Sequence, residues 1–412
     1  MKSTGVRITA LFSAVLSIII ISCSRTADNN FPPDPVPIDL TAAQTSLIKS
    51  ENGFAFDIFK KVLENSSESE NIIISPLSIS CALSMTLNGA NGATRDSMLK
   101  ALRVSSLTPE IINNSWRDLS TALLNVDKRV LISIANSVWS EKNFEVKVPF
   151  RNILTDDYDA ESKSFDITNP LAYQDINNWI DDKTNGLIKE MLSGLEDNTV
   201  MLIVNAIYFK GKWKSQFDKA RTLNGTFYKA DGTASQVPMM KKIADYKIYY
   251  GEGFVLAEFP YGQGNFVMDV LLPDSQHGIS ETISLLNEDD FEGYIDRLAE
   301  RKIDLSFPRF KYGFKQQLNE ILTSMGMGVA FTDNADFSNI SDMKLLINRV
   351  IHQAFIETNE EGTEAAAATI VDVGTTSMPP SVNIDHAFLY LIRETTTNSI
   401  LFMGKVADPL VN

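Results

Sequence analysis

The stretch from Asn359 to Pro380, NEEGTEAAAATIVDVGTTSMPP, carries sequence signals that no single regular element can satisfy. Its Glu-rich start and four successive alanines favour a helix, whereas Ile370, Val371 and Val373 favour a strand. It ends in Gly374, two threonines, a serine and two prolines, which neither element accepts in its interior. We interpret the stretch as a segment that takes up more than one conformation.

Drawn as a strand, this segment has two unlike faces. The first face is uncharged and consists of Thr363, Ala365, Ala367, Thr369, Val371 and Val373. The second face consists of Glu364, Ala366, Ala368, Ile370 and Asp372. The first face can lie against a hydrophobic core while the acidic residues of the second stay in water. Because its side chains are small, the segment can also stand outside the fold as a loop that exposes little apolar surface.

The composition is that of a globular protein with a large core, because 44% of the 412 residues are hydrophobic and 22% are charged. No long linker, repeat or low-complexity run interrupts the chain after about residue 45, which indicates one large domain. The net charge of −15 is spread along the chain, so a basic groove for nucleic acid is not expected. With 3 His and 2 Cys, a closed zinc site is excluded, and we expect no metal and no other cofactor.

The N-terminus resembles an export signal. Lys2 and Arg7 precede the apolar run LFSAVLSIIII, which is too short to span a bilayer comfortably. The run ends in IISC, which resembles a bacterial lipobox, in which cleavage before the cysteine leaves Cys23 acylated. The alternative is an ordinary signal peptide followed by an incidental cysteine.

We therefore predict a lipoprotein signal peptide over residues 1–22, a lipid-anchored, Pro-rich tether over residues 23–44 and a folded domain over residues 45–412. Prolines make the tether extended and semi-rigid. The protein is expected to be exported and anchored through Cys23 to the outer membrane, at the cell surface or on its periplasmic face. If Cys23 is lipidated, Cys81 is the only thiol left and no disulfide can form.

The pattern of apolar residues predicts an α+β fold with largely antiparallel sheets. Helical spacing favours a first helix over residues 41–65, and Ser75 followed by Pro76 favours the start of a second, buried helix that ends near Asn88. Residues 170–192 and 315–327 are also interpreted as helical. Strands are predicted at RVLISIANSVWS, NTVMLIVNAIYFKGKW, GFVLAEFPYG, NFVMDVLLPD, KIDLSFPRFKY and SILFMGKV, and hairpin turns at GEGF and GQGN.

An enzyme is poorly supported. A triad hydrolase needs a nucleophile, a histidine and an acid brought together, and no G-x-S-x-G elbow accompanies His277, His352 or His386. We interpret all three histidines as surface or structural residues. The acidic pairs Asp181–Asp182 and Glu360–Glu361 are expected to be solvated rather than to act in acid–base chemistry.

The sequence resembles the serpins, a family of serine protease inhibitors that insert their own reactive loop into a central sheet. NEEGTEAAAAT is similar to the serpin hinge, and NIIISPLSIS, LNGANGAT, NSVW, INNWIDDKTNGLI, NAIYFKGKW, FPYG, GMGVAFTDNADFS and ILFMGKV are similar to other serpin blocks in family order. The resemblance covers essentially residues 45 to 410. It implies an α+β serpin fold with three largely antiparallel β-sheets, surrounding helices and an exposed reactive-centre loop.

The resemblance implies a suicide-substrate inhibitor that traps serine proteases, with cysteine proteases as a further class of target, as a covalent acyl-enzyme. Counting fourteen residues on from Gly362 places the reactive bond between Thr376 and Ser377, and the following pattern SMPP agrees with that position. The small, neutral Thr376 favours elastase-like or subtilisin-like proteases as partners. We expect a monomer.

The resemblance also assigns roles to other positions. The hinge comprises Glu360, Glu361, Gly362, Thr363, Glu364, Ala365, Ala366, Ala367 and Ala368. The polar shutter beneath the central sheet comprises Ser75, Ser78, Asn205 and His352, and the breach where insertion starts comprises Trp213 and Arg309, with Arg309 paired to Glu360. The alternative function is that of a non-inhibitory surface lipoprotein of serpin fold, which acts as a binding or scaffold protein.

Overall fold

The computed structural model describes residues 35–274, 278–363 and 379–411. All of them belong to one compact unit. Helices and strands are mixed along the chain and the strands pair largely antiparallel, so the predicted α+β class is confirmed.

The first two helices start where the sequence predicted. Thr41 and Gln44 form a reciprocal capping box at the start of α1, and the Ser75 side chain caps α2, which has proline in its first turn. The described helices are α1 (Ala42–Glu64), α2 (Pro76–Leu87), α3 (Gly92–Ala101), α4 (Pro109–Asn125), α5 (Val148–Tyr158), α6 (Ala172–Lys183), η1 (Lys219–Arg221), α7 (Ile279–Ser284), α8 (Glu288–Ile295), α9 (Asn319–Leu322), η2 (Thr323–Met327) and η3 (Gly328–Phe331).

Two of the predicted helical stretches are wrong in part. The stretch over 170–192 is helical only to Lys183, because Asn185 and Gly186 take left-handed backbone conformations that end the helix. Leu192 then lies against the helix through two hydrogen bonds with the Asn177 side chain, at 2.7 and 2.8 Å. In the stretch over 315–327, the first residues complete a strand instead, because they pair with a neighbouring strand.

The strands form two hydrogen-bonded networks in the described part of the chain. The first contains β1 (Ile72–Ile74), β5 (Leu223–Tyr228), β6 (Ala234–Tyr250), β7 (Phe254–Pro260), β8 (Phe266–Pro273), β9 (Ala299–Pro308), β13 (Ser381–Asn383), β14 (Phe388–Glu394) and β15 (Ile400–Val406). The second, a six-stranded sheet, contains β2 (Val130–Glu141), β3 (Glu161–Phe165), β4 (Met201–Lys212), β10 (Phe310–Gln317), β11 (Ile351–Asn359) and β12 (Gly362–Thr363).

Three sheets were expected, and the difference has a simple cause. The 17-residue strand β6 pairs with β5 along its first part, with β9 along its middle and with β7 at its end. It therefore joins two groups of strands into one continuous network. The predicted hairpin turns are confirmed, because the two glycine pairs connect β6 to β7 and β7 to β8.

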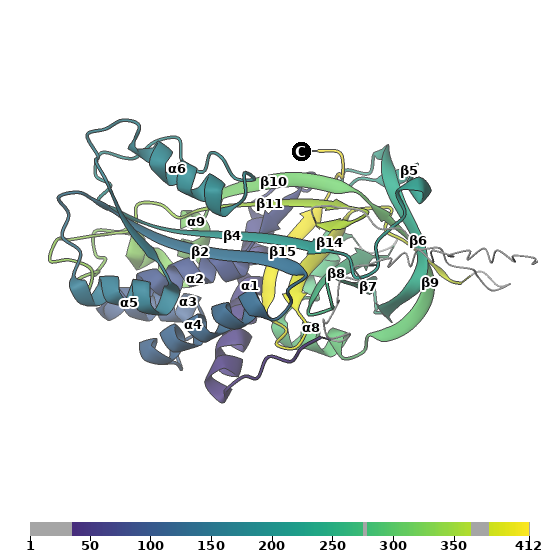
Figure 1. The fold of residues 1–412 in the computed structure, drawn as a ribbon, viewed down its shortest axis with the longest axis horizontal. Helices are drawn as coiled ribbons and strands as arrows, with labels where there is room; N and C mark the ends of the chain where they lie inside the picture. Colours follow the sequence, from purple (N-terminus) through teal and green to yellow (C-terminus); the bar gives the residue numbers. More distant parts are fainter. Residues whose placement is uncertain (1–34, 275–277, 364–378, 412) are drawn as a thin grey trace, which may run out of the picture. The chain divides into compact units, whose positions relative to one another are not determined.

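The six-stranded sheet lies between helices (Figure 1). Helix α6 covers one face of β2 and β4, and α1 to α5 lie on the other side. On the α6 face, Trp179 and Ile180 pack with Val204 and Ala206 in a small separate core. On the opposite face, the sheet contributes to the main hydrophobic core, which also holds α1, α2 and the nine-stranded network. Both faces of the sheet are therefore covered along β4.

The residues just before α1 lie against the folded unit. Val36 and the Asn265 side chain exchange two hydrogen bonds, each 2.8 Å long, and Ile38 N donates to Thr396 Oγ1 at 3.1 Å. Residues 36–38, which belong to the predicted tether, thus contact the folded unit through hydrogen bonds. None of the helices in the described ranges has the length and apolarity needed to cross a membrane.

Candidate functional site

The six-stranded sheet has an unusual central strand. β12 contains 2 residues, whereas the strands on either side of it, β11 and β4, contain 9 and 12. Thr363 pairs with Thr358 of β11 and with Gly211 of β4, both antiparallel. No described residue pairs with the remaining length of β11 on the side of β4. We call this line between β4 and β11 the β12 position.

Gly362 is required where the chain turns into the β12 position. Its φ of 136° lies in a region that only glycine enters readily. A side chain there would also collide with the Gly211 carbonyl and with Lys212. The hinge glycine picked out in the sequence is thus explained by backbone conformation and by close approach of a neighbouring strand.

Aromatic side chains cover the start of the β12 position. The Trp213 ring stacks on Tyr261 with centroids 4.4 Å apart, and the Trp213 indole N–H donates to Asn359 O at 2.9 Å. The hydroxyl groups of Tyr261 and Thr363 lie 3.0 Å apart, and Thr363 is only 6% exposed. The first residue after the hinge glycine is therefore buried in an aromatic pocket.

The prediction that Glu360 and Glu361 are solvated is wrong, because they are 1% and 4% exposed. Arg309 Nε donates to Glu360 Oε1 at 2.7 Å, and Thr222 donates to the same oxygen. Lys219 forms an ion pair with Glu361. Burial alone would raise the pKa of Glu360, but the hydrogen bonds from Arg309 and Thr222 outweigh it and the pKa is lowered. The two carboxylates hold the turn before the hinge glycine in place.

The four polar residues assigned to the shutter are brought together beneath the sheet. The Ser75 side chain donates to Leu401 O at 2.7 Å, and Ser75 N donates to His352 Nε2 at 3.0 Å. The Ser78 side chain donates to Asn205 Oδ1. His352 and Asn205 come from β11 and β4, so the two strands beside the β12 position are tied to the start of α2. Burial lowers the pKa of His352 to about 4, so the ring is neutral at pH 7.

Sequence reasoning missed Asn136 on β2. Asn205 Nδ2 donates to Asn136 Oδ1 at 2.6 Å, and Asn136 Nδ2 donates to Tyr158 O at 2.7 Å. This buried amide extends the polar network from β4 to β2 and α5. The sequence pointed to Asn136 only through the block NSVW, in which it is the first residue. An asparagine within a predicted strand does not by itself reveal which residue of a neighbouring strand it will bond.

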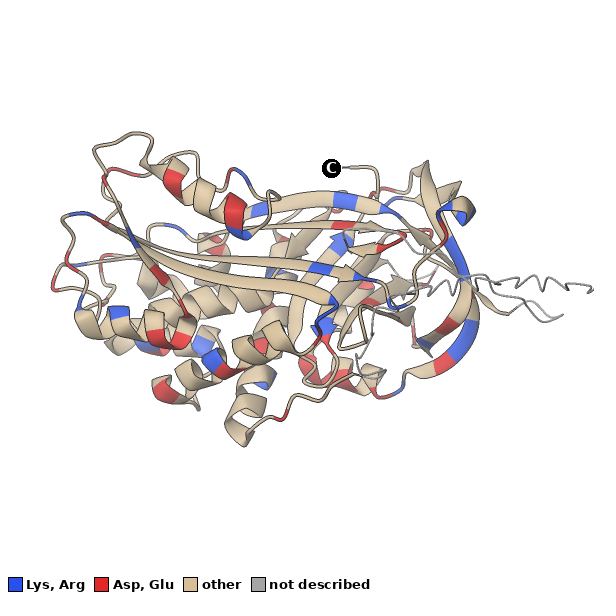
Figure 2. Ribbon diagram, viewed as in Figure 1, with Lys and Arg blue, Asp and Glu red and all other residues tan. Residues whose placement is uncertain are grey.

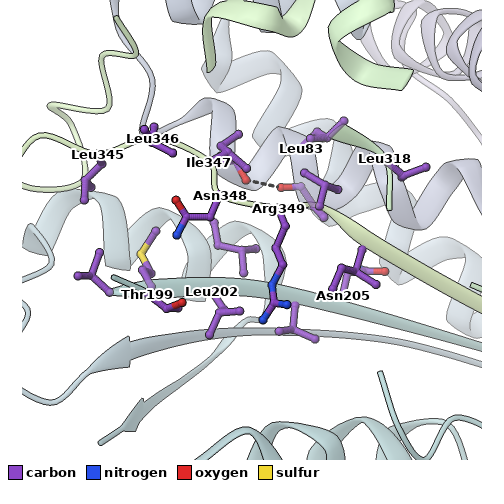
Figure 3. A pocket seen from close by; sticks show the side chains of 18 of the residues that line it. Leu83, Thr199, Leu202, Asn205, Leu318, Leu345, Leu346, Ile347, Asn348 and Arg349 are labelled. Carbon is purple, nitrogen blue, oxygen red and sulfur yellow. Dashed lines mark hydrogen bonds between the residues drawn. The ribbon is translucent and has the colours of Figure 1, made fainter. Parts of the chain in front are cut away.

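A cavity of about 510 Å³ lies at the end of the β12 position opposite to Gly362. Its wall includes residues of α2, of the first part of β4 and of the segment before β11 (Figure 3). Apolar side chains such as Leu83, Leu202 and Leu318 dominate the lining, together with a few polar ones that include Asn205 and Arg349. The cavity therefore continues the line on which Gly362 and Thr363 lie.

Other predicted site residues lie outside the described ranges. These are Cys23, Glu364, Ala365, Ala366, Ala367, Ala368, Thr376 and Ser377, and the same holds for His277.

His386 lies between Asp385 Oδ1 and the Pro273 carbonyl, at 3.0 and 2.7 Å. In the described ranges, no group of three or more His, Cys, Asp or Glu side chains is placed to hold a metal ion. Basic and acidic residues are interspersed along the strands and helices in the view of Figure 2.

Comparison with known proteins identifies the family. The model of the family described as Serpin (serine protease inhibitor) matches residues 49–409. The chain belongs to the serpin family. Serpins are typically protease inhibitors rather than enzymes, so this serpin is not an enzyme.

The relatives and the similar structures cover nearly the whole serpin domain. Serpin-Z1C of Triticum aestivum is 34% identical over 390 residues, which are 89% of this chain and 97% of the relative. A serine protease inhibitor of Cyanea capillata is 34% identical over 382 residues, 89% of this chain and 99% of the relative. Native tengpin, a thermophilic serpin, has a TM-score of 0.81 at 31% identity and covers 91% of this chain and 97% of its own. Human thyroxine-binding globulin in complex with its ligand has a TM-score of 0.82 at 28% identity, with 89% and 100% covered. The serpin fold expected from the sequence is confirmed.

Proposed function

We propose that this serpin is an inhibitory one, which traps serine proteases as covalent acyl-enzymes by inserting its cleaved reactive loop into the β12 position. The observation that carries the proposal is the double pairing of Thr363, which is bonded antiparallel to both β11 and β4. A strand that already has its first two residues in place can be extended by the residues that follow it. Strand addition needs this kind of accessible backbone edge.

The proposed reaction begins as ordinary proteolysis. The protease nucleophile attacks the Thr376 carbonyl, the bond to Ser377 breaks, and the Ser377 amine leaves with a proton from the protease. The acyl-enzyme ester now lies at the free end of the cut loop. If the loop inserts before water hydrolyses the ester, the protease is carried along and its active site is distorted.

The register of β12 indicates where the inserted loop would lie. Continuing the antiparallel pairing residue by residue sets Thr369 opposite His352 and Asn205, so it would reach the polar network of the shutter. The face with Thr363, Ala365 and Ala367 would point to the core. Small side chains on that face fit a covered sheet without displacing the helices beneath it.

The free energy released by insertion is large enough to move the bound protease and distort its active site. Each new backbone hydrogen bond is worth about 1 kcal/mol net, and burying Val371 and Val373 adds roughly 1.5–3 kcal/mol each. Over about a dozen residues the sum is on the order of 10 kcal/mol. The uncut protein must therefore be a strained state, in which the energy is held until cleavage.

The target class follows from Thr376, which is small and uncharged. A pocket that demands Lys or Arg matches it poorly, so elastase-like or subtilisin-like proteases are the proposed partners.

We further propose that the serpin is exported and held at a membrane by an acylated Cys23. Labelling of cells with a fatty-acid analogue tests the anchor, since a Cys23→Ser variant should lose the label.

The inhibitory proposal is tested by mixing the purified protein with a panel of serine and cysteine proteases and running a denaturing gel. A band at the summed mass of serpin and protease, resistant to detergent, is expected with an elastase-like enzyme. A Thr376→Pro variant serves as control, because it should give no adduct at this bond. Cleavage of the serpin by every protease without any adduct would instead support a binding or scaffold function. The similar structure of thyroxine-binding globulin was solved with a bound small molecule and so gives that second function a precedent.

A further inference from the structure

Arg349 lies in the wall of the cavity at the end of the β12 position, two residues before β11. Its guanidinium donates to Gly194 O at 2.6 Å, and no acidic side chain of the described residues pairs with it. In Figure 3 the Arg349 side chain extends from the segment before β11 toward the strand that carries Leu202. Of the described residues that line the cavity, those with a charge at pH 7 are Lys344 and Arg349, and none is acidic. This end of the β12 position is therefore apolar and positively charged.

The reactive segment has the complementary composition. Between Ala365 and Pro380 its one charged residue is Asp372, and apolar Val371 and Val373 flank it. A carboxylate carried into a covered sheet without a cation beside it would oppose insertion strongly. If the reactive segment inserts, the Asp372 carboxylate therefore needs a basic side chain beside it in the sheet.

The pairing register brings these two charges together. The ladder between β10 and β11 continues one residue beyond β11, because Leu318 N donates to Val350 O at 2.8 Å. Arg349 is thus the next position on the line of β11. Extending the β12 register along that line sets Asp372 directly opposite Arg349. Directly opposite residues share a face of the sheet, and pairs of opposite charge there are stabilising.

Arg349 and the inserted Asp372 would also lie on the same face of the six-stranded sheet. Along β11, His352, Ala354, Ile356 and Thr358 are buried, whereas the residues between them are only partly covered. Arg349 belongs to the second set by its odd spacing, and Asp372 belongs to the same outward face as Glu364 of the reactive segment. Both charges would therefore lie on the side of the sheet away from the main core.

We propose that Arg349 binds the Asp372 carboxylate once the cleaved loop has entered the β12 position, an inference that rests on the insertion mechanism proposed above. The pair forms only in the inserted state, so it stabilises the cleaved form and leaves the uncut form unchanged. Arg349 is a positioning residue, because it acts on the loop and not on the scissile bond. Because insertion proceeds from Gly362, the pair closes late and completes the movement of the trapped protease.

The test is a double-mutant cycle in the full-length chain, with Arg349→Gln, Asp372→Asn and both together. Melting temperatures are measured for the uncut protein and for protein nicked between Asp372 and Pro380 by a protease that forms no adduct, with the nick verified by mass. Lys315→Gln is the matched control, because Lys315 also donates to a backbone carbonyl, that of Glu190, at 3.4 Å. A charge-swapped variant, Arg349→Asp with Asp372→Arg, completes the set.

Each single variant is expected to lower the melting temperature of the nicked form by about 2–4 °C and to leave the uncut form unchanged. The double variant should lose no more than either single one, and the charge swap should restore the parent value. Equal effects from the Lys315 control, or additive losses in the double variant, would overturn the proposal. If the double-mutant cycle shows coupling between Arg349 and Asp372 but no protease forms an adduct, the ion pair is supported and the proposed inhibitory function is refuted. If nicking does not raise the melting temperature of the parent, insertion itself is refuted and the pair with it.

Discussion

The hydroxyl groups of Thr363 and Tyr261 lie 3.0 Å apart inside the protein, so the residue that follows Gly362 is held in the sheet. Tyr261 is itself held by stacking on Trp213. Tyr261 and Trp213 thus pack at the site where insertion of the loop would begin. Any change of charge or size at Thr363 acts on the first step of the proposed mechanism.

Thr363→Arg should convert the inhibitor into a substrate. A guanidinium in place of a side chain that is 6% exposed would have to be buried without an acidic partner, which slows insertion relative to hydrolysis of the ester. The measurement is the ratio of adduct to cleaved serpin on a denaturing gel. Thr363→Val, which replaces the hydroxyl with a methyl group at a cost of about 1 kcal/mol, is the control and should still give adduct. Inhibition by the arginine variant at the rate of the parent would refute this account of insertion.

His352 should make the protein less stable in acid. Its folded pKa of about 4 lies below the value of 6.5 for an exposed histidine, so the unfolded chain takes up a proton first as the pH falls. The contribution is fully present above pH 6.5 and is lost between pH 6.5 and 4. Each pKa unit corresponds to about 1.4 kcal/mol, which gives roughly 3 kcal/mol in all. Urea unfolding at several pH values should therefore show a steeper loss for the parent than for His352→Gln. Parallel curves for the two proteins would contradict the prediction.

Glu51 should have the opposite pH dependence. Its carboxylate is buried between α1 and α2, with no hydrogen-bond or ion-pair partner among the described residues, and this burial raises its pKa to about 8. The stability of the protonated form is fully present below pH 4.5 and is lost as the pH rises through 8. Glu51→Gln keeps the shape without the charge, so it should raise the melting temperature at pH 9 and have little effect at pH 5. The exposed Glu64, on the same helix, gives a control variant that should change neither value.

Asn205→Ala should destabilise the uncut protein. It would leave the Ser78 hydroxyl and the buried Asn136 carbonyl oxygen without their partners on β4. An unsatisfied buried polar group costs about 1–3 kcal/mol, so the free energy of unfolding in urea should fall by that amount. The nicked form should lose less if Thr369 supplies a replacement hydrogen bond after insertion. Equal losses in the two forms would argue against Thr369 reaching this network.

Several elements could be predicted from local sequence alone. Thr41 with Gln44, and Ser75 with Pro76, cap their helices through residues three positions apart or fewer, so nearby sequence was sufficient to place both helix starts. The strands were found because their apolar runs are bounded by turn residues. Gly362 was recognised because a hinge signature is a contiguous motif. Prediction failed for residues 187–192, where hydrogen bonds to Asn177 replace the helix that propensity favoured.

By itself the sequence determined the α+β class and the serpin family, because caps, periodicity and contiguous motifs are local properties of the chain. Only the tertiary structure decided that Glu360 and Glu361 are buried, since their cations, Arg309 and Lys219, come from elements that lie 51 and 142 residues away in sequence. It likewise decided that Asn136 contacts the polar residues assigned to the shutter and that Arg349 continues the line of β11, beside the end of the β12 position. These are properties of strand order and register, which place residues of distant sequence side by side and which local sequence does not encode.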